Sequence, residues 1–213
     1  MYKYIFKNIF DRVFSLILLI ILSPLLIIVS IISLLINGRP ILFSQKRPGK
    51  NNRIFKMYKF RSMNNKTDQN GVLLPDEERL TKFGLFLRKS SIDELPSLIN
   101  ILKGDMSFIG PRPLLVKYLP YYTKNEQIRH TVKPGLTGLA QINGRNLLSW
   151  DKRIALDIEY VQNISLFNDI KIIIYTLKKV IKRADIVVGS DHIMEDFDVE
   201  RKKKMKTGDV KNV

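Results

Sequence analysis

The most prominent pattern in the sequence is a long apolar segment near the N-terminus. From Val13 to Gly38 the chain has no charged residue and consists mostly of Leu and Ile. A helix of about 20 such residues spans the hydrocarbon core of a bilayer. The segment is longer than the apolar part of a secretory signal, and no small-residue cleavage site follows it. A buried core helix is the alternative, but the pattern favours a helix inserted in a membrane.

The way in which this helix inserts depends on its middle and its flanks. Pro24, preceded by Ser23, removes a backbone donor and opposes a straight helix. Basic residues favour the cytoplasmic side of a membrane segment, and here both flanks are basic. A helix that breaks at Ser23-Pro24 and returns to the same face satisfies both flanks, whereas a kinked spanning helix satisfies one; these residues alone leave both open. The basic residues are Lys3, Lys7 and Arg12 before the segment, and Arg39, Lys46, Arg47 and Lys50 after it.

Beyond the apolar segment, the pattern predicts short elements. Residues 41–60 contain two apolar pieces around a turn at Pro48-Gly49-Lys50-Asn51, which predicts a small hairpin. Residues 64–78 are polar and predict a surface loop. Apolar residues at helical spacing predict three further helices, the first of which ends at Gly104. Their apolar positions are Leu95, Leu98, Ile99 and Leu102; Leu147, Leu148, Ile154, Ala155, Ile158 and Val161; and Ile170, Ile173, Ile174, Leu177 and Ile181.

The last of these helices has a basic face, which is typical of a helix lying in a membrane interface and also of a solvated surface helix. The basic residues on this face are Lys171, Lys178, Lys179, Lys182 and Arg183.

The pattern divides the chain into a membrane anchor over residues 1–39, a globular domain over 40–185 and a basic tail over 186–213, which we expect to be loosely ordered against anionic lipid. The predicted class is mostly α with a small β-hairpin.

The amino-acid composition limits which partners and which kinds of site the chain can have. The 213 residues include 36 basic and 20 acidic residues, which gives a net charge of +16. Phosphate-rich partners match this charge, whether nucleic acid, an anionic membrane or phosphorylated substrates. The absence of cysteine excludes disulfides, thiolate metal sites and cysteine nucleophiles, and two histidines are too few for a multi-histidine metal centre.

An acidic pair is the first candidate for chemistry. Asp93 and Glu94 lie where an apolar-periodic helix begins, with Ser91 at capping-box spacing from Glu94, although Pro96 suggests a start nearer Asp93. The free N–H groups of a helix start keep a carboxylate ionised. An ionised aspartate ligates Mg²⁺ or attacks phosphorus, and the neighbouring glutamate ligates a cation or moves a proton. Helix capping alone would also explain the pair.

Several cations accompany the pair in short segments rich in turn residues. Together with carboxylates that suit Mg²⁺ and with a membrane anchor, they indicate phosphoryl chemistry. No Walker A loop and no GxGxxG motif is present, which argues against ATPase and Rossmann functions. The tract KPGLTGLAQINGR resembles a binding loop weakly and fits a plain connector equally well. The cations are Lys59, Arg61, Arg88, Arg112 and Arg145.

Taken together, these segments resemble a known family. The motifs KRPG, YKFRSM, SSIDELPSLINILKGDMSFIGPRPL and KPGLTGLAQINGR are similar to those of the bacterial sugar transferases, and within them the small PglC-like monotopic phosphoglycosyl transferases. The resemblance covers roughly residues 1–185. It implies transfer of a sugar phosphate from a UDP-sugar to a polyprenyl (undecaprenyl) phosphate, with release of UMP, at the cytoplasmic face of the inner membrane in bacterial glycoconjugate assembly.

The resemblance also implies roles for individual residues. Asp93 would be the nucleophile that forms a covalent phosphosugar intermediate, Glu94 would assist by proton transfer or cation placement, and Mg²⁺, held by the same two carboxylates, would offset the diphosphate charge. The basic residues named above, Lys59, Arg61, Arg88, Arg112 and Arg145, would be substrate-binding candidates. The family's re-entrant helix is broken at a Ser-Pro pair, which Ser23-Pro24 matches, so re-entry is favoured and both ends of the anchor are expected on the cytoplasmic side.

Two other functions remain open. One is a membrane-anchored glycosyltransferase that releases UDP, although the soluble part is short for a nucleotide-binding glycosyltransferase domain. The other is a non-catalytic basic module that binds a membrane. Nucleic acid is not an expected partner, because the aromatic residues do not interleave with the basic ones as a stacking platform would. A C2 homodimer is the default expectation for an oligomer.

Overall fold

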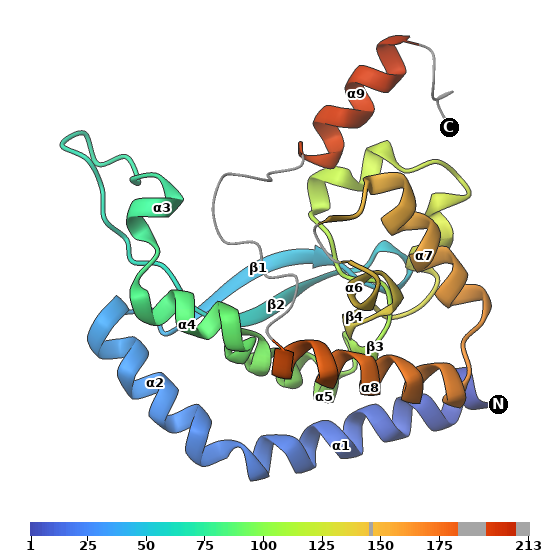
Figure 1. Ribbon diagram of the computed structural model, residues 1–213, viewed down its shortest axis with the longest axis horizontal. Helices are drawn as coiled ribbons and strands as arrows, with labels where there is room; N and C mark the ends of the chain where they lie inside the picture. The colour runs from blue at the N-terminus through green and yellow to red at the C-terminus, as the bar shows by residue number, and fades with distance from the viewer. Residues whose placement is uncertain (145–146, 183–194, 208–213) are drawn as a thin grey trace.

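Helices make up most of the chain and surround two small two-stranded sheets (Figure 1). The computed structural model describes residues 1–144, 147–182 and 195–207. The predicted class, mostly α with a small β-hairpin, is confirmed. The strands are β1 (Leu42–Pro48), β2 (Ile54–Phe60), β3 (Ser107–Ile109) and β4 (Gly135–Thr137). The α-helices are α1 (Lys7–Ile21), α2 (Ser23–Asn37), α3 (Asp76–Arg79), α4 (Lys82–Ser90), α5 (Leu98–Lys103), α6 (Leu139–Ile142), α7 (Trp150–Gln162), α8 (Leu166–Lys182) and α9 (Phe197–Thr207).

The apolar N-terminal segment forms two helices rather than one. Tyr2–Ile21 and Ser23–Asn37 meet at a bend of 64°, and α1 and α2 run along one edge of the molecule (Figure 1). Pro24 has no N–H to donate to the carbonyl of Ile20, and Ser23 Oγ donates to that carbonyl instead at 2.7 Å. The predicted break is therefore confirmed as a bend.

Membrane insertion of this segment stays a prediction. Within residues 1–144, 147–182 and 195–207, no single helix is both long and apolar enough to cross a bilayer. The bent pair of helices reaches the required length and composition only when the two are taken together.

The predicted hairpin is confirmed, and it supports the helix that follows the acidic pair. β1 and β2 pair antiparallel, from Leu42 opposite Phe60 to Pro48 opposite Ile54. Asn100 of α5 reaches the edge of β2, where its Nδ2 donates to the carbonyl of Lys56 at 2.7 Å and its Oδ1 accepts from the N–H of Tyr58 at 3.0 Å. These bonds satisfy the free edge of β2 and fix α5 against the hairpin.

Two glycines are required by the backbone around this region. Gly104 ends α5 with φ of 88°, a left-handed conformation that glycine adopts without a Cβ penalty, so the predicted helix stop is confirmed. Gly84 in α4 lies against the backbone of Ser62, where a Cβ would come within 1.7 Å of the Ser62 carbonyl oxygen. This close approach brings α4, which carries Arg88, next to the end of β2.

A buried carboxylate links the N-terminal helices to the rest of the chain. Asp169 of α8 is 2 % exposed and accepts from Lys7 Nζ at 2.5 Å and from the Tyr2 hydroxyl at 2.6 Å. The hydroxyl of Tyr160, in α7, donates to the other carboxylate oxygen at 2.8 Å. A buried charge with these three donors is fully paired, which makes it a specific attachment of α1 to α7 and α8.

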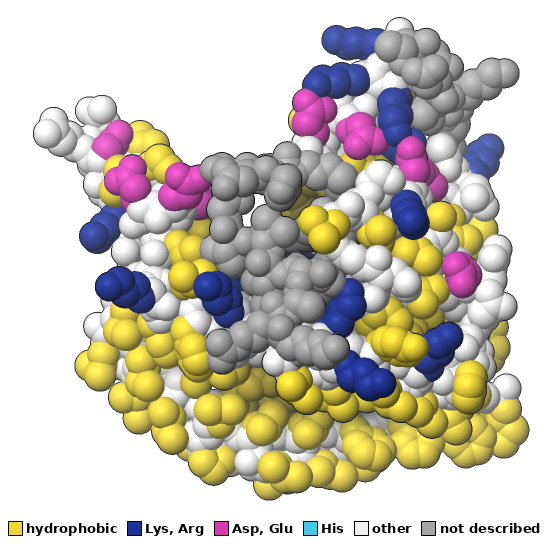
Figure 2. Space-filling view, viewed as in Figure 1, with side chains coloured by type: hydrophobic (Ala, Val, Ile, Leu, Met, Phe, Trp, Pro, Cys, Tyr) yellow, Lys and Arg dark blue, Asp and Glu magenta, His cyan; other side chains and the backbone are white. Residues whose placement is uncertain are grey.

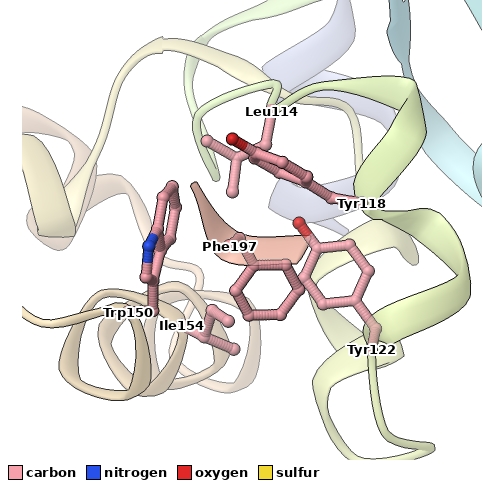
Figure 3. Packing of buried hydrophobic residues seen from close by; sticks show 6 residues of the cluster. All are labelled: Leu114, Tyr118, Tyr122, Trp150, Ile154 and Phe197. Carbon is pink, nitrogen blue, oxygen red and sulfur yellow. The ribbon is translucent and has the colours of Figure 1, made fainter. Parts of the chain in front are cut away.

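The C-terminal segment differs from the prediction. The expectation of a loosely ordered tail is wrong for residues 197–207, which form α9 with Phe197 at 0 % exposure. The Phe197 ring stacks on Tyr122 at 4.9 Å and meets Trp150 edge-on at 5.4 Å (Figure 3). We refer to these buried side chains as the aromatic cluster: Leu114, Tyr118, Tyr122, Trp150, Ile154 and Phe197.

Candidate active site

A large cavity of about 1600 Å³ gathers the residues that the sequence singles out. It lies between the hairpin, α1, α8 and the 3₁₀ helix Ile92–Ser97, and it exceeds the roughly 300–1,000 Å³ of ordinary ligand pockets. Arg145 lies outside the described residues, and Ser23 and Pro24 are not among the lining residues. The predicted site residues that line the cavity are Lys59, Arg61, Arg88, Asp93, Glu94 and Arg112.

The acidic pair begins a 3₁₀ helix rather than an α-helix. Ser91 precedes it in a left-handed conformation with φ of 57° and makes no side-chain capping bond. The predicted capping box is therefore wrong, because Ser91 does not have the extended backbone of an N-cap and Glu94 points to other partners. Pro96 lies inside this helix, beyond its first turn, because the helix begins at Ile92 rather than nearer Asp93.

Glu94 is held by two cations. Its Oε1 accepts from Lys59 Nζ at 2.7 Å and from Arg112 Nη2 at 3.0 Å. Burial opposes ionisation of this carboxyl, but Arg112 and Lys59 outweigh burial and hold the pKa of Glu94 well below its usual range. Glu94 is therefore an anion at all physiological pH values, and it positions both cations.

Asp93 has a different environment from its neighbour. Within the described residues its carboxylate has no hydrogen bond and no ion pair. Burial, followed by repulsion from Glu94, raises the pKa of Asp93 to about 6, while Lys59, Arg112 and Arg88 act in the opposite direction. Asp93 is therefore mostly ionised at pH 7, but the cations rather than a helix start keep it so. A carboxylate that is ionised and unpaired is available to attack or to bind a cation.

The remaining predicted cations divide into two kinds. Arg88 Nε donates to Ser62 Oγ at 2.9 Å, and Arg88 lines the cavity and acts to lower the pKa of Asp93. Arg61 is 7 % exposed and donates to the carbonyls of Gly38 and Arg39, both at 3.0 Å. Because these carbonyls follow α2, Arg61 attaches the end of the anchor to the hairpin rather than offering its charge to a ligand.

Other polar residues that were not predicted as site residues also line the cavity, among them Arg47, Gln141 and Arg153. Burial, followed by repulsion from Arg112, lowers the pKa of Arg47 to about 10, and the same two causes lower the pKa of Arg153. Both amide atoms of Gln141 are buried without a hydrogen-bond partner in the part of the chain described. This wall therefore has excess positive charge and unsatisfied polar atoms, which is typical of a site for an anionic ligand.

The sequence contained a partial signal for one of these residues. Gln141 lies in KPGLTGLAQINGR, where a lone polar side chain in the apolar piece GLAQI points to a binding role. Arg153 has no such signal, because it looks like an ordinary polar position of the amphipathic helix α7. Its guanidinium lies over the ring of Trp150, three residues earlier in the same helix, at 4.3 Å from the centroid.

The carboxylates also decide whether a metal fits. Among the described residues, no three carboxylates and histidines come together as a metal-binding group. Mg²⁺ commonly takes only one or two protein carboxylates and completes its coordination with water and substrate phosphates. The free carboxylate of Asp93 and the second oxygen of Glu94 fit that pattern, so a divalent cation bound jointly with a phosphorylated substrate suits the site.

The geometry favours phosphoryl chemistry over the other classes. Fixed cations surround one paired and one unpaired carboxylate, which is the arrangement that binds a diphosphate and presents an oxygen nucleophile to it. A non-catalytic basic surface would not need a half-buried carboxylate that, within the described residues, has no partner among these cations.

Comparisons with known proteins agree with this chemistry. The profile of the bacterial sugar transferase family matches residues 2–183. The chain is 51% identical over 177 residues to the "uncharacterized sugar transferase EpsL" of Bacillus subtilis (strain 168), which covers 83% of this chain and 88% of that protein.

Other relatives are longer than this chain. It is 39% identical over 194 residues to the undecaprenyl-phosphate galactose phosphotransferase of Salmonella typhimurium, covering 83% of this chain and 40% of that protein. It is 38% identical over 191 residues to the UDP-glucose:undecaprenyl-phosphate glucose-1-phosphate transferase of Xanthomonas campestris pv. campestris, covering 84% and 40%. The chain therefore spans about two fifths of these two relatives.

Proposed function

The chain belongs to the bacterial sugar transferase family, and from this premise we propose that it transfers a sugar 1-phosphate from a UDP-sugar to polyprenyl (undecaprenyl) phosphate and releases UMP. The names of the relatives support the general reaction, since several are undecaprenyl-phosphate sugar phosphotransferases. The observation that carries the proposal is the contrast within the acidic pair: Glu94 is paired to two cations, whereas Asp93 is mostly ionised at pH 7 and has no partner in the described part of the chain.

In the first step, a carboxylate oxygen of Asp93 attacks the phosphorus that bears the sugar. A P–O bond forms to Asp93, and the P–O bond to the bridging oxygen of the diphosphate breaks, so that UMP leaves with that oxygen and its electron pair. The leaving phosphate is stable as a dianion, so this step requires no proton. Lys59, Arg88 and Arg112 offset the charge of the diphosphate as it develops.

In the second step, a phosphate oxygen of the polyprenyl phosphate attacks the same phosphorus. The new P–O–P linkage forms, the bond to Asp93 breaks, and the carboxylate returns to its starting state. The dianionic lipid phosphate carries the electron pair for the new bond, so again no proton has to move. The soluble nucleotide leaves before the lipid reacts, which allows one cavity to serve both substrates.

Within this scheme we assign Glu94 to cation placement. Its pKa lies far below neutrality, which makes it a weak base, and Lys59 and Arg112 already occupy one of its oxygens. Asp93 and Glu94 would also hold Mg²⁺, which supplies charge neutralisation at the diphosphate when it is bound. We further propose a re-entrant anchor at the inner membrane with the cavity on the cytoplasmic side, supported by the basic flanks and the 64° bend.

Nucleotide release tests the proposal directly. The chain in detergent with undecaprenyl phosphate, Mg²⁺ and a panel of UDP-sugars should form UMP in a lipid-dependent manner. Asp93→Asn should reduce turnover at least about 10³-fold, because an amide neither attacks phosphorus nor offsets positive charge. Glu77→Gln, which removes an exposed carboxylate outside the cavity, is the control and should leave turnover unchanged. Release of UDP instead of UMP would overturn the proposal in favour of a glycosyltransferase.

A further inference from the structure

The cavity extends beyond the acidic pair into an apolar arm between two helices. We refer to this part as the α1–α8 arm. Its walls are mainly apolar, and both helices contribute apolar residues at helical spacing to the same space. Asp11 of α1 also lines the cavity, but it is 5% exposed and accepts from the N–H of Phe108 at 3.2 Å. The residues that define the arm are Phe10, Phe14 and Leu18 of α1 and Ile170, Ile173 and Leu177 of α8.

The apolar stripes of α1 and α8 do not bury each other. Phe14 is 50% exposed and Ile173 is 41% exposed, although both face the cavity rather than the outer surface alone. A pair of helices that packed directly would bury such side chains in each other's grooves. The arm is therefore an apolar surface that the described chain leaves unfilled.

The arm has defined ends. Near the start of both helices, Lys7 and Tyr2 hydrogen-bond Asp169, and these three side chains line the cavity and bridge α1 to α8. Lys59 and Asp93 line the same cavity. An apolar chain lying in the arm would thus present its polar end to the cations and to the nucleophile.

The arm also borders the apolar face of the molecule. Figure 2 shows hydrophobic side chains gathered along the lower face, over α1 and α2, with lysines and arginines above them. Ile174 and Ile181 of α8 add to the apolar exposed surface at 46% and 80% exposure. A ligand that lives in a bilayer would reach the arm from this face without crossing water.

We infer that the α1–α8 arm binds the isoprene units next to the phosphate of the acceptor lipid and directs that phosphate to Asp93. This inference rests on the proposed function. The occupant is a polyprenyl phosphate rather than a bilayer phospholipid, because the arm opens onto the cations around Asp93, and a phosphate monoester attached directly to an apolar chain joins the two surfaces. A phospholipid places glycerol esters where the arm is apolar.

The test compares two adjacent residues of α8. Ile173→Trp places a larger side chain in the arm, whereas Ile174→Trp changes a similarly exposed residue that does not line the cavity. Tryptophan suits a membrane interface, so neither change should release the protein from membranes. We expect Ile173→Trp to raise the KM for undecaprenyl phosphate at least about tenfold and Ile174→Trp to leave it within about twofold, with the KM for the UDP-sugar unchanged in both.

The outcomes separate this inference from the proposed function. The first half-reaction, a burst of UMP without acceptor, should persist in both variants at the amplitude of the parent chain. Equal KM values for the lipid in both variants and the parent, or equal increases in both variants, would overturn the inference. Absence of any UMP from the parent chain would instead overturn the proposed function.

A second measurement does not depend on a substituted protein. Polyprenyl phosphate with a photoreactive group in its first isoprene units should label peptides from α1 and α8 of the unmodified chain. Excess undecaprenyl phosphate should suppress this labelling, and phosphatidylglycerol should not. Equal competition by phosphatidylglycerol would show that the arm holds bilayer lipid and would overturn the inference, as would labelling confined to other elements.

Discussion

The aromatic cluster and the cavity use apolar side chains in opposite ways. In the aromatic cluster the chain supplies all the partners: Phe197 is fully buried, the Trp150 N–H donates to the Glu195 carbonyl at 2.8 Å, and the Tyr118 hydroxyl donates to Asp196 at 3.0 Å. In the cavity, Phe14 and Ile173 stay about half exposed and the amide of Gln141 has no partner among the described residues.

The difference shows which region stabilises the fold and which awaits a ligand. A closed cluster contributes to the free energy of folding, because its apolar groups are removed from water and its polar atoms exchange water for hydrogen-bond partners in the protein. An open apolar surface next to unpaired polar groups contributes little to folding and remains available for binding. Variants in the aromatic cluster should therefore change stability, and changes at the cavity should change turnover.

The largest effect that we expect in this comparison comes from breaking the aromatic cluster. Phe197→Ala should lower the free energy of unfolding by about 3–5 kcal/mol, because it leaves a cavity among buried rings. Denaturant unfolding in detergent, followed by Trp150 fluorescence, measures this loss. Val199→Ala, on the same helix at 40% exposure, is the matched control and should change stability by less than about 0.5 kcal/mol. Equal stability of both variants would mean that α9 does not dock as described.

Removal of divalent cations should act on the cavity alone. Chelation with EDTA should lower turnover roughly 100-fold, because a divalent cation supplies several kcal/mol of charge stabilisation at a phosphoryl oxygen. Added Mg²⁺ should restore turnover, and the unfolding midpoint of the ligand-free protein should not move. Undiminished turnover in EDTA would remove Mg²⁺ from the proposed reaction, and a lower unfolding midpoint would mean that the metal also supports the fold.

The smallest of these effects is the pH dependence of the first step. Asp93 attacks as the anion, and its pKa is raised to about 6, so single-turnover UMP release should increase about tenfold from pH 5 to pH 7. Lys59→Met removes a cation that lowers the pKa of Asp93, so the midpoint should move to higher pH. A rate that is flat between pH 5 and 7, or a midpoint that moves to lower pH in Lys59→Met, would contradict the assignment of Asp93 as nucleophile.

Local rules predicted much of the fold. Pro24 and its flanks predicted the break in the anchor, the Pro48-Gly49 turn predicted the hairpin, and Gly104 predicted the end of α5. Each of these features depends on backbone geometry within a few residues, so the residue types at those positions are enough to predict it. The motif around Asp93 likewise indicated phosphoryl chemistry, which agrees with the family match, because the residue types restrict what a site can do. The roles of the individual residues stay predictions.

The remaining features depend on contacts between distant parts of the chain. The sequence predicted Arg61 as a phosphate ligand, but in the fold it donates to carbonyls at the end of α2. The C-terminal tail was predicted to be loosely ordered, but in the fold Phe197 packs against Tyr122 and Trp150. Arg153 could not be distinguished from a surface residue of an amphipathic helix, because the cavity it lines is built from segments remote in sequence.

The different environments of Asp93 and Glu94 show most clearly what the sequence alone does not determine. By itself the sequence predicted that Asp93 and Glu94 lie at a helix start, that several cations accompany them, and that the apolar N-terminal segment is broken at Pro24. Only the tertiary structure decided that Lys59 and Arg112 pair with Glu94, while Asp93 has no hydrogen bond or ion pair among residues 1–144, 147–182 and 195–207. The physical reason is that ionisation depends on burial and on charges within a few ångströms, and the fold rather than the order of residues sets those distances.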